Sequence, residues 1–377
     1  MKRRLTALAV AALATLASAL PISAFTPQST SASHALAWLH TLQGADGTVA
    51  GSASRTEDTV LGLVANGQAV TSFASAGKTP IDSLRLHIAD EEKTAGNIGG
   101  LVMAVSAAGL SPTNFAARNL LQDLACTYDA STGAYNSQLF NDALAVLALP
   151  VGSAPAKAVA FLKDRQLSDG GWEFSATWGS DSNTTAVVVL ALASANGMTA
   201  VVKERVLAYF HLRQKASGGF EYATGSPDSD PNSDAAVIQA LLAIGEDPTG
   251  PAWTITGKNA VSDLLTFQFE NGGLGFSRPG SPQAAAPDAL STTQALVALA
   301  SKHLPVTPTE GALPSTCPSV PTTTPTPTPT PAPTPTPTPS TTQLATTGGP
   351  PDPTPLLPMV AGIAMVALGW RLRRRPR

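Results

Sequence analysis

The chain has few of the residues that carry metal, redox or strong charge chemistry. Of its 377 residues only 2 are cysteine and 5 are histidine, and 13% are charged. The formal net charge is −3, and no basic run occurs inside the repeated region described below, which excludes the electrostatic footprint of a nucleic-acid-binding protein. None of the histidines stands at a recognisable metal-ligand spacing. They are His34, His40, His87, His211 and His303.

The two cysteines, Cys126 and Cys317, fit an exported protein. An even number of cysteines in an oxidising compartment predicts one disulfide, which would tie the end of the repeated region back to its third repeat. A loop of this length nominally gains up to about 5 kcal/mol from chain entropy. Two free thiols are the alternative.

The most informative feature is a repeated phrase. An apolar run, a glutamine, a glycine pair and an aromatic are followed by a polar loop and a second apolar run. The clear copies begin at Gln166, Gln214 and Gln268, about 50 residues apart, and weaker copies precede them. About six repeats between residues 33 and 305 predict about twelve helices, enough to close a ring.

The second run of each repeat predicts an inner helix. The runs at residues 183–193, 233–243 and 291–300 are rich in alanine, leucine and valine, and Asn183, Ser233 and Ser291 stand at their predicted N-caps. Helices that are apolar on nearly all sides are buried on all sides. The first runs, such as residues 158–166, are amphipathic and fit an outer layer.

This phrase resembles the repeat shared by squalene and hopene cyclases, protein prenyltransferase β subunits, complement thioester domains and cobalamin carriers. The resemblance implies an all-α fold, an α/α toroid of helical hairpins around a central cavity. It also implies that the glutamine and the aromatic tie one repeat to the next. The residues concerned are Gln166, Trp172, Gln214, Phe220, Gln268 and Phe276. Glycine, which tolerates positive φ, suits the tight turn between them.

The catalytic motifs of these relatives are missing. The chain has no Asp-x-Asp-Asp string, no Asp/Cys/His zinc set and no Cys-Gly-Glu-Gln motif. A shared fold does not by itself imply a shared function, so the resemblance alone does not predict catalysis or a certain cofactor.

The two ends of the chain predict export and display. Residues 1–24 have a basic start, an apolar run and small residues before Phe25, which is typical of a cleaved signal peptide. Residues 306–343 are rich in Pro and Thr and predict an extended stalk. Residues 344–377 hold a pentapeptide, an apolar run of about 15 residues that is short for a membrane span, and a basic tail expected to stay cytoplasmic.

The pentapeptide resembles a Gram-positive sortase signal of the Leu-Ala-x-Thr-Gly type. Its residues are Leu344, Ala345, Thr346, Thr347 and Gly348. The resemblance implies a sortase and the peptidoglycan as partners, and a protein anchored to the cell wall or to the outer face of the membrane. A permanent C-terminal membrane anchor is the alternative.

One acidic loop holds oxygen side chains at alternate positions, as the start of an EF-hand loop does. They are Asp228, Asp230, Asn232 and Asp234. This spacing predicts a calcium site, although the turn glycine and the closing glutamate of an EF-hand are missing. The alternative is a solvated loop in which Asp234 caps the next helix.

Ligand recognition is expected where the loops enter the inner helices. The residues expected there are Trp178, Asp181, Asn183, Tyr222, Arg278 and Asp288. An aromatic such as Trp178 can stack on a sugar or pack on its own loop. We therefore predict a wall-displayed, non-catalytic binding or interaction module whose ligand is a glycan, an isoprenoid, a corrinoid or a protein. A toroid enzyme of the terpene-cyclase or polysaccharide-lyase kind, a cobalamin or isoprenoid carrier, and a plain spacer are the alternatives.

Overall fold

The computed structural model describes residues 25–91, 94–135, 138–281, 286–313 and 317. The chain divides into two compact units, residues 1–313 and 314–377, and the first holds every described helix. The predicted signal peptide, most of the stalk and the sorting pentapeptide lie outside the described residues. Those predictions stay predictions.

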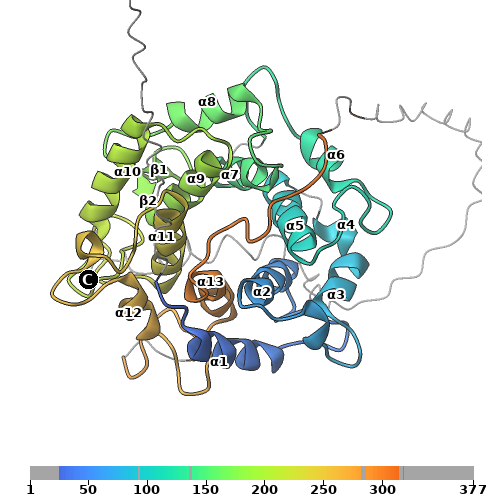
Figure 1. The fold of residues 1–377 in the computed structure, drawn as a ribbon, viewed down its shortest axis with the longest axis horizontal. Helices are drawn as coiled ribbons and strands as arrows, with labels where there is room; N and C mark the ends of the chain where they lie inside the picture. Colours follow the sequence, from blue (N-terminus) through green and yellow to red (C-terminus); the bar gives the residue numbers. More distant parts are fainter. Residues whose placement is uncertain (1–24, 92–93, 136–137, 282–285, 314–316, 318–377) are drawn as a thin grey trace, which may run out of the picture. The chain divides into compact units, whose positions relative to one another are not determined.

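Six inner helices form a closed ring in the first unit (Figure 1). Each contacts the next in chain order, and the last contacts the first. Thr293 donates a hydrogen bond to Asp58, and one turn further on Leu296 lies against Gly62, so these two neighbours run parallel. The inner helices are α2 (Ala53–Ala65), α5 (Ala95–Ala107), α7 (Leu139–Ala148), α9 (Ser182–Ser194), α11 (Pro231–Ala243) and α13 (Ala289–Leu299).

Six outer helices surround this ring, one before each inner helix (Figure 1). They are α1 (Ser29–His40), α3 (Pro80–Leu86), α6 (Leu120–Ala125), α8 (Ala156–Asp164), α10 (Ala200–Arg213) and α12 (Ala260–Leu265). The short helix α4 (Ile88–Glu91), two 3-10 turns (Val70–Ser72 and Pro251–Trp253) and one two-stranded hairpin complete the unit. The hairpin pairs β1 (Trp172–Glu173) with β2 (Ser180–Asp181) antiparallel. The predicted helical, two-layered ring is confirmed.

The inner helices begin earlier than the sequence analysis predicted. Asp181, Asp230 and Asp288 are the N-caps of α9, α11 and α13, and each accepts a hydrogen bond from a backbone N–H three residues later. Asn183 and Ser233 therefore lie inside the first turn. The predicted capping role of Asp234 is wrong, because Asp230 fills that position and a carboxylate cap satisfies the free amides there.

Gln214 and Gln268 tie one repeat to the next, as the resemblance implied, whereas the side chain of Gln166 donates to Gly170 in its own loop. The Nε2 atom of Gln214 donates to Gly218 O at 2.9 Å in its own loop and to Trp253 O at 2.8 Å, ahead of the next outer helix. Gly218 has a φ of +89°, and a Cβ on it would overlap the backbone at Asn259. Glycine is therefore required where one repeat touches the next.

The aromatic clamp is confirmed for Trp172 and Phe220 but wrong for Phe276. Trp172 and Phe220 have no exposed surface, and Trp172 Nε1 donates to Leu162 O at 2.7 Å. Phe276 is 44% exposed. Leu274 is the residue that corresponds to Trp172. The backbone N–H of Leu274 donates to Thr292 Oγ1 at 2.8 Å, and the backbone N–H of Trp172 donates to Thr185 Oγ1 at 2.9 Å.

Helix α5 approaches both of its neighbours through glycines. A Cβ on Gly96 would overlap Asn141 and one on Gly99 would overlap Leu144 O, both on α7. A Cβ on Gly100 would overlap Glu57 of α2. Helix α5 therefore lies too close to α7 and α2 to carry a side chain at any of these three positions.

Residues 302–313 cross the end of the ring at which the inner helices end (Figure 1). Thr309 is buried 3.5 Å from Ser106 in the last turn of α5, and Gly311 lies against Leu121 of α6. The packed chain thus continues past the predicted domain end at residue 305.

Two further predictions touch the described residues. Neither Cys126 nor Cys317 is a free thiol. In the part of the chain that the structure describes, no helix is both long enough and apolar enough to span a membrane. The apolar run expected to halt in the membrane, residues 356–370, falls outside that part.

Candidate ligand site on the inner face of the ring

One position on every inner helix is partly open to solvent while both of its chain neighbours are buried. It is the sixth residue after the N-cap, and its residues are Asp58, Gly100, Leu144, Val187, Ala236 and Gln294. The same partial exposure on six parallel helices means that these residues face the axis of the ring. We call this side of the inner helices the axial face.

The third residue further along each helix lies on the same face, one turn deeper. These residues are almost fully buried. Most of them still have a few per cent of their surface exposed, whereas their neighbours in the chain have almost none. They are Leu61, Met103, Leu147, Leu190, Gln239 and Val297. One turn deeper, the axial face is thus apolar except for the amide of Gln239.

The axial face has a polar side and an apolar side. Asp58, Gln294 and Gln239 belong to α2, α13 and α11, which are consecutive in the ring, and Asn232 lies one turn above Ala236 on α11. We call these four residues the polar arc. The three helices opposite carry an apolar arc on the same face: Gly100, Met103, Phe140, Leu144, Val187 and Leu190. Asn183, one turn above Val187 on α9, is the polar exception on that side.

Asp58 is the most informative residue of the polar arc. Burial raises its pKa, and Arg55 and a hydrogen bond from Thr293 only partly offset this. Nevertheless 31% of its side chain is accessible to water. A carboxyl that protein surrounds and water still reaches lies at an opening to solvent, and its protonated form is favoured as long as no countercharge is bound.

Several buried oxygens beside this opening have no hydrogen-bond partner in the structure. Asn232 and Gln239 are 3% and 7% exposed, and neither amide oxygen is bonded. The amide oxygen of Asn183 and the second carboxylate oxygen of Asp181 are in the same state at the start of α9. Buried acceptors without donors cost about 1–3 kcal/mol each, which a ligand with donor groups would offset.

The structure brings three of the residues expected at the mouth together. Asp181 and Asn183 begin α9, and Tyr222 accepts a backbone hydrogen bond from Ser182 at 2.8 Å. Burial raises the pKa of Tyr222, and the charges of Asp181 and Asp230 add to this, so those carboxyls are close. Burial also raises the pKa of Asp181 to about 6, against hydrogen bonds from Thr184.

Trp178 is the outer end of a row of aromatic rings. Its ring centroid lies 6.0 Å from that of Phe174, which lies 6.1 Å from that of Phe140 on α7. Trp178 is 60% exposed. The row therefore leads from the apolar arc to solvent, so Trp178 both packs against its own loop and presents a free ring face.

The remaining two residues expected at the mouth have other partners. Arg278 contacts Asp228 at 2.5 Å and Asp263 of α12 at 2.9 Å, and its guanidinium lies over the ring of Phe267. Asp288 caps α13 through Ser291. Neither residue is on the axial face.

Three of the four oxygen residues of the predicted calcium loop point to separate partners, and the amide oxygen of the fourth, Asn232, has none. Asp228 pairs with Arg278, Asp230 caps α11, and Asp234 accepts the backbone N–H of Phe220 at 2.6 Å. Burial and the neighbouring Asp263 raise the pKa of Asp234 well above its usual range. In the described ranges no three His, Cys, Asp or Glu side chains form a metal-binding group, and calcium binding would require these residues to leave their partners.

Sequence reasoning missed Asp58, Gln239 and Gln294. Each stands in a run otherwise typical of a buried helix, and no motif marks it. Aligning the six inner helices on their N-caps would have shown a polar residue at an axial position in these helices. That alignment needs the helix starts, which the sequence placed two or three residues late.

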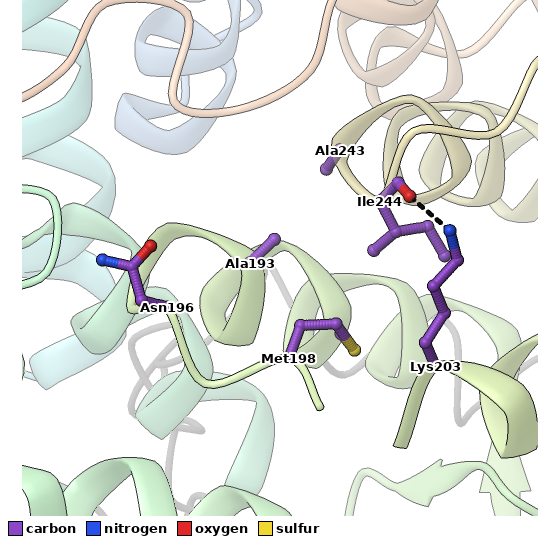
Figure 2. A pocket seen from close by; sticks show the side chains of 6 residues that line it. All are labelled: Ala193, Asn196, Met198, Lys203, Ala243 and Ile244. Carbon is purple, nitrogen blue, oxygen red and sulfur yellow. Dashed lines mark hydrogen bonds between the residues drawn. The ribbon is translucent and has the colours of Figure 1, made fainter. Parts of the chain in front are cut away.

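A hollow of about 350 Å³ lies elsewhere, at the C-terminal ends of α9 and α11 (Figure 2). Its one charged side chain, Lys203, already donates to Ile244 O at 2.7 Å and pairs with Glu246 at 2.8 Å. A second hollow, of about 500 Å³, is lined by Phe25, Asp247 and Asn259 among others. Neither is lined by the unpartnered amide oxygens of Asn232 and Gln239.

The fold is similar to that of several solved toroid structures. The type II terpene cyclase MstE from Scytonema in its apo form has a TM-score of 0.55 at 16% identity, over 72% of this chain and 97% of that one. A protein from Actinoplanes has a TM-score of 0.53 at 16% identity, over 73% and 99%. No protein-family model and no curated protein sequence matches the chain.

A carbohydrate-active enzyme has the same architecture. The α-1,6-mannanase GH76A of Salegentibacter, an inactive variant in complex with α-1,6-mannotriose, has a TM-score of 0.53 at 10% identity, over 74% of this chain and 99% of that one. At such identities these similarities establish the α/α toroid fold alone. Function must be argued from the site.

Proposed function

We propose that this protein is a displayed binding module that takes a small amphipathic molecule on the axial face of its ring. The observation that carries the proposal is the division of that face into a polar arc and an apolar arc. Ligand sites are concave and mostly apolar, with a few polar groups that fix orientation, and the axial face has this composition. The residues 302–313 cover one end, so the ligand enters where the inner helices begin.

The aromatic row supports the same proposal. A ligand longer than the axial space would leave it over Phe140, Phe174 and the exposed Trp178, where flat or apolar groups can stack. Isoprenoids, corrinoids and glycans with an apolar face all fit this description. The row does not choose among them.

A blocking substitution on the axial face tests the proposal. Ala236→Trp places a large ring on the axial face of α11, and Val201→Trp on the outer helix α10, where Val201 is 66% exposed, is the matched control. Octyl glucoside serves as a neutral amphipathic probe. At 100 times its dissociation constant it should stabilise the protein and the control by about 2.7 kcal/mol. Equal stabilisation of the Ala236→Trp variant would contradict the proposal.

Asp58 favours one second candidate, an enzyme that donates a proton to an alkene. A carboxyl whose pKa is raised by burial and that still faces an opening has the property that such a step needs. The step requires that the protonated acid give its proton to one alkene carbon, leaving a carbocation that a neighbouring π bond attacks. Incubation with geranylgeranyl dihydroxybenzoate, the compound bound in one MstE variant, tests this. A cyclised product lost in Asp58→Asn would support the enzyme over the binding module.

Wall display is proposed from the sequence alone. A sortase would cut between Thr347 and Gly348 and join the new carboxyl group to the peptidoglycan. Intact-mass measurement of the protein released by muramidase tests this. A cross-bridge fragment on Thr347 is expected, whereas retention of Trp370 and Arg371 would show a permanent anchor instead.

A further inference from the structure

We propose that the ligand of the axial face carries a positively charged amino group. The polar arc binds this group, and the apolar part of the ligand packs on the apolar arc. The inference rests on the proposed binding function and names the chemical class of its ligand. It has two independent supports.

The first support is the charge of the open end of the ring. The first two turns of the inner helices, with their N-caps, carry these carboxyl groups: Glu57, Asp58, Asp142, Asp181, Asp230, Asp234 and Asp288. Among the described residues of those turns, Arg55 is the only cation. Helix N-termini offset about half a charge each, so a negative excess remains at the entrance when these carboxyls are ionised. Burial raises the pKa of Asp58, Asp181, Asp230 and Asp234, and a bound cation would favour their ionised forms.

The second support is the kind of hydrogen bond that is missing. The unpartnered atoms of Asn232 and Gln239 are both amide oxygens, in residues more than nine-tenths buried on the axial face. These oxygens accept hydrogen bonds and cannot donate, so they need donors. An ammonium group has three N–H donors and no acceptor, so it satisfies such oxygens without leaving a lone pair of its own buried.

Asp58 supplies the countercharge, because an ammonium group beside it would favour its charged form over the protonated form that burial favours. Arg55 Nη1 stands 3.6 Å from its Oδ2, longer than a hydrogen bond, and Thr293 donates to the same oxygen at 3.3 Å. Its accessible surface faces the axis. A carboxylate ligand would meet the negative excess at the entrance, and a neutral ligand would leave that excess uncompensated.

Three probes that share one tail test the charge. Octan-1-amine, octan-1-ol and octanoate are compared by calorimetric titration at pH 7 with the unaltered protein, Asp58→Asn and Asp164→Asn. Asp164 lies exposed on the outer helix α8 and serves as the matched loss of charge. The amine should bind at least about tenfold more tightly than the alcohol, a difference of about 1.4 kcal/mol, and octanoate most weakly.

Asp58→Asn should remove the preference, so that octan-1-amine and octan-1-ol bind this variant about equally, and Asp164→Asn should keep the preference of the unaltered protein. Equal binding of all three probes to the unaltered protein would overturn the charge inference and leave the amphipathic site standing. A preference retained in Asp58→Asn would also overturn it. Failure of every probe to bind, octyl glucoside included, would overturn the proposed function itself.

Discussion

The side chain of Gln268 donates a hydrogen bond to Ser31 O at 2.9 Å, across 237 positions of the chain. The same Nε2 atom donates to Gly272 O at 2.8 Å, and Gly272 lies against the backbone of His34 in α1. Gln268 therefore ties the sixth repeat to the first, in the same way that Gln214 ties the fifth repeat to the sixth. This contact closes the ring.

Gln268→Ala should lower the free energy of unfolding by about 2–3 kcal/mol, because two carbonyl oxygens lose their donor at once. Gln166→Ala is the matched comparison, since Gln166 donates to Gly170 within its own loop. We expect a loss of about 1 kcal/mol there. Urea unfolding measures both, and equal losses would show that ring closure adds nothing to this contact.

Trp172→Ala should destabilise the protein by about 3–5 kcal/mol, because it empties a fully buried site and removes the bond to Leu162 O. Phe276→Ala should cost less than about 0.5 kcal/mol, since most surface substitutions do. Thermal unfolding of the two variants separates the clamp from the exposed ring. A large loss for Phe276 would restore the role that its sequence position suggested.

Acidification should stabilise the protein through Asp181. Its folded pKa of about 6 exceeds the ordinary value of 3.8, so the folded state holds the proton more tightly than the unfolded state does. This stabilisation is complete below about pH 4 and is lost as the pH rises through about 6. The difference amounts to about 3 kcal/mol.

Asp181→Asn should abolish that dependence, because asparagine keeps the cap but does not titrate. The measurement is the difference in unfolding free energy between the variant and the unaltered protein at pH 4, 5, 6 and 7, with Asp164→Asn as the control. A difference that stays constant over this range would mean that Asp181 titrates normally.

Calcium chelation should leave the melting temperature unchanged. Asp230 and Asp234 already bond to Ser233 and to Phe220, and a metal would have to displace both contacts. Differential scanning calorimetry with and without chelator decides this. A fall in melting temperature that disappears in Asp230→Ala would show that the loop rearranges around calcium.

The sequence predicted the ring because its repeats are local signals. The glutamine, the glycine pair and the apolar runs recur at a fixed spacing, and each reports on its own turn or helix. Phe276 was misassigned because two aromatic or aliphatic candidates follow its glycine pair. Only the hydrogen bond from Leu274 to Thr292 shows which one enters the core.

The site was predictable only in part. Asp181, Asn183 and Tyr222 stand in polar loops, where side chains are conspicuous, and the structure places them near one another. Asp58 comes close to the helix of Gln294 only through the closure of the ring, which joins α2 to α13 across most of the chain. Gln239 lies one helix further round, on α11. A contact between helices that are distant in the sequence cannot be recognised from the composition of either helix alone.

The glycines of α5 determine how closely this helix approaches its two neighbours, and so the width of the ring at this point. Gly96, Gly99 and Gly100 let this helix lie so close to α7 and α2 that a single methyl group on any of them would overlap a neighbour. An alanine there would push α5 outward without changing any side chain of the polar arc. The size of the ligand and the chemistry that recognises it are therefore set by different residues, and one can change while the other is kept.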